Sequence, residues 1–275
     1  MYGCGEAKAL ARMVLEERYH LTMTDILLGR EAQLTPPQQA QLRDIVARLS
    51  AGEPVQHILG YADFCGHRFR VTPDVLIPRP ETEELVQWIL TVERGIGGEV
   101  AILDLGTGSG CIALSLAHAL PDTTVTAIDS SPAALTIARR NAVDLGLLPP
   151  SVTFLHADML NTQDLVAQLS TQPPFDVIVS NPPYVRHSEA TTIHDNVLRH
   201  EPSSALFVPD SDPLIFYRAI ATIANALLQP HGAIFVELNS ALAQDTQALF
   251  RTAGFRNTQL RRDQFGQWRM LRASR

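Results

Sequence analysis

Apolar side chains recur at helical spacing over roughly the first 50 residues of the chain. The repeat is clearest in two runs: Leu10, Met13 and Val14, then Leu42, Ile45, Val46 and Leu49. Between them, Thr35-Pro36-Pro37 has the signature of a helix start, with threonine as N-cap and proline in the first turn. The pattern predicts a small helical domain over residues 1–51.

The pattern changes at residue 52, where glycine and proline begin to interrupt short apolar segments. Residues 69–71 and 75–77 are expected to be short strands, so we predict a structured connector or hairpin over residues 52–80. An amphipathic helix is expected to begin near Thr82, because apolar residues follow it at helical spacing: Leu85, Val86, Ile89 and Leu90.

From residue 99 onward, apolar strands alternate with helical stretches, which is typical of an α/β fold with a doubly wound, mostly parallel sheet. The end differs, since 257–262 and 267–271 flank a turn and predict an antiparallel hairpin at the sheet edge. We predict one α/β domain over residues 81–275. The expected strands are 100–105, 124–128, 152–155, 177–180 and 233–238, with helices at 111–120, 132–141 and 214–228.

The composition fits a globular chain: 275 residues, 45% apolar and 19% charged, with a mean hydropathy of +0.03. No apolar run reaches the roughly 18 residues of a membrane span, and no secretory signal is visible. Cys4, Cys65 and Cys111 are far apart in sequence and are expected to be free or buried thiols. We therefore expect a cytoplasmic protein without a membrane partner.

The net charge of −7 is unevenly distributed. Residues 251–275 contain seven arginines and one acid, Asp263. An acidic chain is a poor nonspecific binder of nucleic acid, because that affinity depends largely on neutralising phosphates. The arginine-rich end is interpreted as a solvated strand face, and contact with RNA or an acidic partner is the alternative.

A glycine-rich loop follows the first strand of the α/β region: Asp104-Leu105-Gly106-Thr107-Gly108-Ser109-Gly110. Glycine is needed where the backbone turns sharply and approaches a ligand closely. The spacing is GxGxG, which departs from the GxGxxG dinucleotide fingerprint, and the loop lacks the Lys-Ser/Thr pair of a P-loop. Asp129, 19 residues after Gly110, closes the second strand, where a carboxylate can accept both ribose hydroxyls and disfavours NADP. A tight turn with an incidental acid is the structural alternative.

The second motif, Asn181-Pro182-Pro183-Tyr184, directly follows the apolar strand at 175–180. Its prolines stop the strand, which leaves a stiff turn at the sheet edge where α/β folds bind ligands. The asparagine oxygen and a nearby backbone carbonyl can accept both hydrogens of a substrate NH₂ group, and Tyr184 supplies an aromatic wall. Such a site would position a poor nucleophile for in-line attack on a methyl group. A merely rigid turn is the alternative.

The glycine spacing resembles motif I of the class I S-adenosylmethionine-dependent methyltransferases, which have a Rossmann-like α/β fold. In that family the residue pair after the third strand borders the adenine, and Asp158-Met159 occupies this place. The Asn-Pro-Pro-Tyr motif resembles that of methyltransferases acting on adenine N6, cytosine N4 or a glutamine amide. DNA enzymes of this kind must also flip a base and normally carry a basic recognition domain, so a nucleic-acid substrate is the weaker option.

The connector identifies a narrower resemblance. Residues 52–60 (Gly-Glu-Pro-Val-Gln-His-Ile-Leu-Gly), 77–83 (Ile-Pro-Arg-Pro-Glu-Thr-Glu) and 200–206 resemble the release factor glutamine methyltransferases of the HemK/PrmC family. The resemblance implies N5-methylation of the glutamine in the Gly-Gly-Gln motif of class 1 release factors, with S-adenosylmethionine as cofactor and no stable nucleic-acid binding.

The resemblance also implies residue roles. Asn181, Pro182, Pro183 and Tyr184 would hold the glutamine amide, with Asn181, Pro182 and Tyr184 as the catalytic residues. The cofactor would contact the loop residues Gly106, Thr107, Gly108, Ser109 and Gly110, together with Asp129, Asp158, Met159 and Asn181.

Two segments depart from the family pattern: Met159 stands where an aromatic residue is frequent, and residues 207–213 replace a glycine-rich segment. Arg79 either contacts substrate or has a structural role near a helix start, and Glu201 and Glu237 are candidates for packing acids.

Other functions have less support from the sequence. A ribosomal-protein glutamine methyltransferase shares the Asn-Pro-Pro-Tyr motif but differs in the connector. A nucleotide-binding oxidoreductase and a noncatalytic binding module are further alternatives. The nine histidines show no HExxH or paired-ligand spacing, so no metal site is expected, and the GxSxG motif of serine hydrolases is missing.

Overall fold

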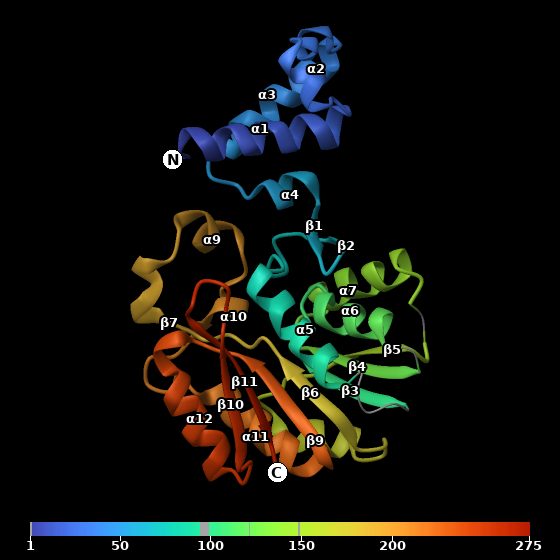
Figure 1. Cartoon of the computed structure of the whole chain (residues 1–275), viewed down its shortest axis with the longest axis vertical. Helices are drawn as coiled ribbons and strands as arrows, with labels where there is room; N and C mark the ends of the chain where they lie inside the picture. Colours follow the sequence, from blue (N-terminus) through green and yellow to red (C-terminus); the bar gives the residue numbers. More distant parts are fainter. Residues whose placement is uncertain (1, 94–98, 121, 148) are drawn as a thin grey trace.

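The computed structural model describes residues 2–93, 99–120, 122–147 and 149–275. Its N-terminal part is helical, as predicted, and forms a group at one end of the molecule (Figure 1). Thr35 is the N-cap of the third helix and bonds the Gln38 side chain, with proline in the first turn, which confirms the predicted start. The elements are α1 (Cys4–Tyr19), α2 (Met23–Leu27), η1 (Arg30–Gln33) and α3 (Pro36–Ser50).

The connector contains a short helix, α4 (Val55–Leu59), and an antiparallel hairpin of β1 (Tyr61–Phe64) and β2 (His67–Arg70). The predicted strand at 75–77 is wrong. Pro73 and Pro78 flank this segment and cannot donate to a sheet, and the Ile77 amide donates to the Glu201 carboxylate at 3.1 Å instead. Val75 and Ile77 are apolar because they pack against the hairpin and a helix of the α/β domain.

A seven-stranded sheet forms the α/β domain, in the order β10-β11-β9-β6-β3-β4-β5. The central strands pair in parallel, and the last two form the predicted antiparallel hairpin. A separate pair, β7 (Val185–Arg186) and β8 (Phe207–Val208), follows the Asn-Pro-Pro-Tyr turn. The sheet strands are β3 (Val100–Leu105), β4 (Thr123–Asp129), β5 (Val152–His156), β6 (Phe175–Ser180), β9 (Leu228–Glu237), β10 (Asn257–Arg262) and β11 (Trp268–Ser274).

Helices cover both faces of this sheet, and each face has its own apolar core (Figure 1). Alternate residues of β3 point to opposite faces: Ile102 joins the core under α5 and α6, whereas Leu103 joins the core under α11 and α12. The helices are α5 (Pro80–Glu93), α6 (Cys111–Ala119), α7 (Pro132–Asp144), α8 (Thr162–Leu169), η2 (His187–Thr192), α9 (Asp195–His200), α10 (Ser203–Leu206), α11 (Ile215–Leu227), η3 (Ser240–Leu242) and α12 (Ala243–Thr252).

The parallel register aligns the strand ends that carry the two motifs. Asp104 of β3 lies opposite Val179 of β6 and Ala127 of β4. The Ser180 hydroxyl at the end of β6 donates to the Leu105 carbonyl at 2.6 Å. The glycine loop, the Asn-Pro-Pro-Tyr turn and Asp129 therefore leave the sheet side by side at its carboxyl edge, next to the point where strand order reverses.

Asn141 on α7 connects the connector hairpin to the glycine loop and is fully buried. Its Oδ1 accepts the Arg70 amide at 2.8 Å, and its Nδ2 donates to the carbonyls of Arg70 at 3.2 Å and Ser109 at 2.8 Å. One amide side chain thus satisfies three backbone groups from segments far apart in the sequence.

We expect Asn141→Ala to lower the free energy of unfolding by about 3 kcal/mol, because it leaves three backbone groups without their partner in a dry environment. Asn225→Ala is the matched control, since exposed Asn225 makes one bond, to the Ala253 carbonyl at 3.0 Å, and should cost under about 1 kcal/mol. Urea unfolding of both variants measures the difference. Equal costs would contradict this role for Asn141.

Candidate active site

A cavity of about 260 Å³ lies at the carboxyl edge of the sheet, where the ends of β3, β4, β5 and β6 meet helix α5. Thr82 and Arg79 line it from the start of α5, and Phe216 from α11. Most of the residues predicted to form the site line the cavity: Gly106, Thr107, Gly108, Ser109, Asp129, Asp158, Met159, Asn181 and Pro183. Gly110, Pro182 and Tyr184 are not among the lining residues.

Asp129 holds the glycine loop in place from the neighbouring strand. Its Oδ2 accepts the Gly108 amide at 2.8 Å, and its Oδ1 accepts the Ser131 amide at 2.8 Å. Burial raises the pKa of Asp129, and the two backbone donors act in the opposite direction. Each carboxylate oxygen keeps a further lone pair, so this acid can still accept hydroxyl groups from a ligand in the cavity.

All three glycines of the loop have positive φ, and Gly106 and Gly110 are also closely packed, for different reasons. Gly106 (φ +77°) faces the cavity, and a Cβ there would lie 3.1 Å from the Met159 methyl group. Gly110 (φ +82°) packs α6 against α7, since its Cβ would lie 3.2 Å from that of Ala138. Gly106 therefore shapes the cavity floor, whereas Gly110 acts through helix packing.

Asp158 and Met159 follow β5, as the sequence analysis expected. Met159 is buried (7% exposed) beside the glycine loop, so its side chain forms an apolar wall. Asp158 is exposed, and its Oδ1 accepts the Leu160 amide at 2.8 Å, which fixes the turn after β5. The two residues thus contribute different surfaces to the same side of the cavity.

Asn181 forms a hydrogen bond that the sequence analysis missed. Its Nδ2 donates to Thr82 Oγ1 at 3.1 Å, and the Thr82 hydroxyl donates to Glu237 Oε2 at 2.6 Å. The NH₂ end of the Asn181 amide is therefore engaged, and its carbonyl oxygen is the end available to the cavity. From the sequence, Thr82 is recognisable only as a residue near a helix start, because no local pattern links it to Asn181, which lies 99 positions later.

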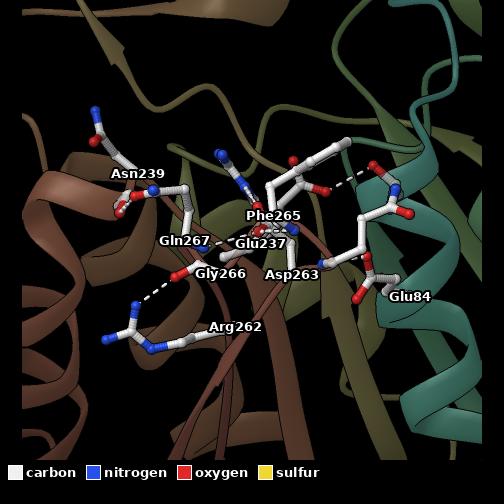
Figure 2. A network of polar contacts seen from close by, with 12 residues as sticks. Glu84, Glu237, Asn239, Arg262, Asp263, Phe265, Gly266 and Gln267 are labelled. Atoms are coloured by element: carbon white, nitrogen blue, oxygen red, sulfur yellow. Dashed lines mark hydrogen bonds and ion pairs between the residues drawn. The ribbon is translucent and has the colours of Figure 1, made fainter.

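Tyr184 and Pro182 stabilise the turn without lining the cavity. Pro182 is buried, and the Tyr184 hydroxyl donates to Glu237 Oε1 at 2.9 Å. Burial and the nearby Glu237 carboxylate raise the pKa of Tyr184, so its hydroxyl keeps its proton. The Tyr184 carbonyl accepts the side-chain amide of Asn239 at 3.1 Å. Figure 2 shows Glu237 and Asn239 in a polar network together with Asp263 and Gln267.

Arg79 lines the cavity beside a buried partner. Its guanidinium donates to Glu201, whose side chain is 1% exposed and whose other oxygen accepts the Ile77 amide. One face of Arg79 remains open, since its side chain is 34% exposed. Glu201 therefore anchors the connector and the start of α5 to the segment before α10.

Residues 207–213 brace the segment that follows the Asn-Pro-Pro-Tyr turn. Phe207 and Val208 pair with Val185 and Arg186, and Asp210 accepts both the amide (3.1 Å) and the hydroxyl (2.6 Å) of Ser188. This replacement for a glycine-rich segment is thus a structured part of the cavity surroundings.

Within the described ranges, no group of three or more His, Cys, Asp or Glu side chains is arranged to hold a metal ion. No helix in the same ranges is long and apolar enough to cross a membrane. The cysteines are unpaired: Cys4 is exposed, Cys65 half-buried and Cys111 buried.

Comparison with known sequences gives two family matches. The family model described as Methyltransferase small domain matches residues 85–205, and the PrmC N-terminal domain matches residues 2–60. The chain is 42% identical to the release factor glutamine methyltransferase of Bacteroides thetaiotaomicron over 275 residues, which is 100% of this chain and 95% of that relative. It is also 42% identical to the release factor glutamine methyltransferase of Flavobacterium psychrophilum, covering 98% of this chain and 92% of the relative.

Comparison with solved structures shows what the fold of this chain is similar to. The T. thermophilus 16S rRNA methyltransferase RsmC, solved with AdoMet and guanosine, superposes with a TM-score of 0.54 at 20% identity. The superposition covers 78% of this chain and 49% of that one. At this identity the likeness concerns the fold alone, and it matches the α/β sheet described above.

A buried acid next to the cavity provides a pH-dependent test. Asp104, near the carboxyl end of β3, is fully buried, and the Thr107 hydroxyl donates to its Oδ2 at 2.7 Å. Burial raises the pKa of Asp104 to about 7, and the hydrogen bond from Thr107 opposes this shift only in part. Because the folded pKa lies above the unfolded value of about 3.9, stability from this group is present at low pH and is lost as pH rises toward 7.

We expect the wild type to lose about 3 kcal/mol of stability through Asp104 between about pH 5 and about pH 8. Asp104→Asn removes the ionisation while keeping an acceptor for Thr107, so its stability should fall less over the same interval. Urea unfolding of both proteins at the two pH values measures the difference. Parallel pH profiles would show that Asp104 does not ionise in this range.

Proposed function

Because this chain belongs to the family of release factor glutamine methyltransferases, we propose that it methylates the glutamine side chain in the Gly-Gly-Gln motif of class 1 release factors. The protein is a protein-glutamine methyltransferase with a class I methyltransferase fold. The proposal includes S-adenosylmethionine as methyl donor, N5 of the glutamine as acceptor, and a role for each residue of the cavity.

The orientation of Asn181 is the observation that carries the proposal. A glutamine amide has two N–H donors, and it needs two acceptors to be held with its nitrogen facing a methyl group. The free oxygen of Asn181 supplies one acceptor, and we assign the second to the Pro182 carbonyl in the same turn. Because the two prolines restrict the backbone, this pair of acceptors is already in position before the substrate binds.

The residues around the glycine loop fit S-adenosylmethionine. Asp129 has lone pairs left for two ribose hydroxyls, and Gly106 leaves room that a Cβ would fill. Met159 offers an apolar surface for the adenine, and the Gly106–Gly110 backbone passes the amino-acid part. The bound cofactor would supply an electrophilic methyl group on a sulfonium.

This site contributes to catalysis by positioning the substrate rather than by removing a proton from it. An amide nitrogen is a poor nucleophile because its lone pair is conjugated with the carbonyl, and its proton can leave to water after the methyl group has been transferred. Glu237, the acid nearest Asn181 in the network, already accepts two hydroxyl groups and is not a cavity-lining residue. Holding the amide in line with the methyl group is therefore the main catalytic contribution.

We expect Asn181→Ala to lower the rate of methyl transfer by about 100-fold or more, because the acceptor that orients the substrate amide is lost. Cofactor affinity should fall only modestly, since Asp129 and the loop are unchanged. Asn257→Ala is the control, because exposed Asn257 lies at the opposite end of the sheet, paired with Ser274. Activity of Asn181→Ala equal to that of Asn257→Ala would contradict the mechanism.

The substrate is tested directly by incubating the protein and S-adenosylmethionine with unmethylated release factor, its Gly-Gly-Gln→Gly-Gly-Ala variant, large ribosomal subunits or duplex DNA. Mass spectrometry should find one added methyl group, on the glutamine of the wild-type release factor only. Methylation of ribosomal protein or DNA without methylation of release factor would overturn the substrate assignment and leave the fold untouched.

A further inference from the structure

We propose that Thr82 and Glu237 are positioning residues that determine which end of the Asn181 amide faces the substrate. The inference rests on the proposed function, because it concerns the acceptor that holds the glutamine amide. It assigns a task to Thr82, a cavity-lining residue at the start of α5, and to Glu237, a buried acid at the end of β9.

The three side chains form a directed series of hydrogen bonds. Asn181 Nδ2 donates to Thr82 Oγ1 at 3.1 Å, and Thr82 Oγ1 donates to Glu237 Oε2 at 2.6 Å. Thr82 and Glu237 are each 2% exposed, so water does not compete for the bond between these two side chains.

The direction of the series follows from the number of protons available. Glu237 Oε2 accepts the Thr82 hydroxyl and Glu237 Oε1 accepts the Tyr184 hydroxyl, so both oxygens of this acid are acceptors in the network. Thr82 has one hydroxyl proton, which is committed to Glu237, so Thr82 can only accept from Asn181. The NH₂ end of Asn181 must then face Thr82, which turns the carbonyl oxygen toward the substrate.

The arginine-rich hairpin of β10 and β11 stabilises the Tyr184 and Glu237 end of this network. Arg269 donates to Asp263 at 3.2 Å and lies 3.5 Å from the Tyr184 hydroxyl. Asp263 also accepts the amides of Phe265 and Gln267, and the Gln264 amide donates to Glu84 of α5 at 3.0 Å. Figure 2 shows Glu84 on α5 facing the turn that carries Asp263 and Phe265. The hairpin turn therefore connects α5, which carries Thr82, to β9, which carries Glu237.

Changing Glu237 to glutamine should reverse the series without adding or removing bulk. A glutamine in this place has only one carbonyl oxygen for two hydroxyl donors. If its NH₂ group faces Thr82, the threonine proton becomes free to bond the Asn181 oxygen, and Asn181 presents its NH₂ end to the substrate. Two NH₂ groups would then face each other, which is a repulsive arrangement.

The test compares Thr82→Val, which keeps the shape and loses the hydroxyl, with Thr82→Ser, which keeps the hydroxyl. We expect Thr82→Val to lower kcat for release factor methylation about 10-fold or more, with KM and cofactor affinity within about twofold of the wild type. Thr82→Ser should recover most of kcat. Glu237→Gln should lower kcat similarly, and the double variant Thr82→Val with Glu237→Gln should be no worse than either alone, because both act through one series.

A second measurement does not depend on activity. In nitrogen-15 NMR spectra, the side-chain NH₂ signal that disappears in Asn181→Ala identifies Asn181. We expect one of its protons to be protected from exchange with water in the wild type and in Thr82→Ser, and to lose this protection in Thr82→Val. An unprotected signal in the wild type, or equal kcat for wild type and Thr82→Val, would overturn the series. Failure of the wild type to methylate release factor would instead refute the proposed function, and the NMR result would still decide the orientation of Asn181.

Discussion

The parallel register of β3 with β6 and β4 is the constraint on which the site depends. It places Gly106, Asn181 and Asp129 at the ends of adjacent strands, although these residues come from three separate parts of the sequence. Each strand is buried on both faces, so a shift of register would expose apolar side chains along its whole length. The distances within the cavity are therefore determined by the packing of the sheet rather than by the loops alone.

Buried polar side chains then attach the remaining walls of the cavity to this sheet. Asn141 holds the connector hairpin, Glu201 holds the start of α5 and the segment before α10, and Glu237 holds Thr82 and Tyr184. A buried polar group is costly unless it is bonded, so each of these side chains favours one arrangement of its surroundings over looser alternatives. Specific hydrogen bonds thus shape the cavity at the places where apolar packing alone would allow neighbouring elements to slide past one another.

The sequence predicted those parts of the molecule that local patterns determine. Apolar runs indicated the sheet strands of the α/β domain, and the spacing of glycine and proline located the loop of Gly106 and the turn of Asn181. The hairpin strand β1 was missed, and a strand was wrongly placed at 75–77, because apolar residues that fill space between elements resemble a short strand in sequence. Thr82, Asn141 and the bonding of Glu237 could not be found, since their partners lie tens of residues away and become neighbours only in the folded sheet.

The two hydroxyl groups that Glu237 accepts explain why an acid so close to the site need not act as a base. Burial raises the pKa of Glu237, while the hydroxyls of Thr82 and Tyr184 favour its ionised form. An acid held in this way is a fixed acceptor. Its role is to determine the direction in which the neighbouring hydroxyl groups donate their hydrogen bonds. An amide nucleophile gains little from a base, because its proton becomes acidic only as the methyl group arrives, but it gains much from fixed geometry. An acid separated from the substrate by two residues, Thr82 and Asn181, therefore suits this chemistry better than one in contact with it.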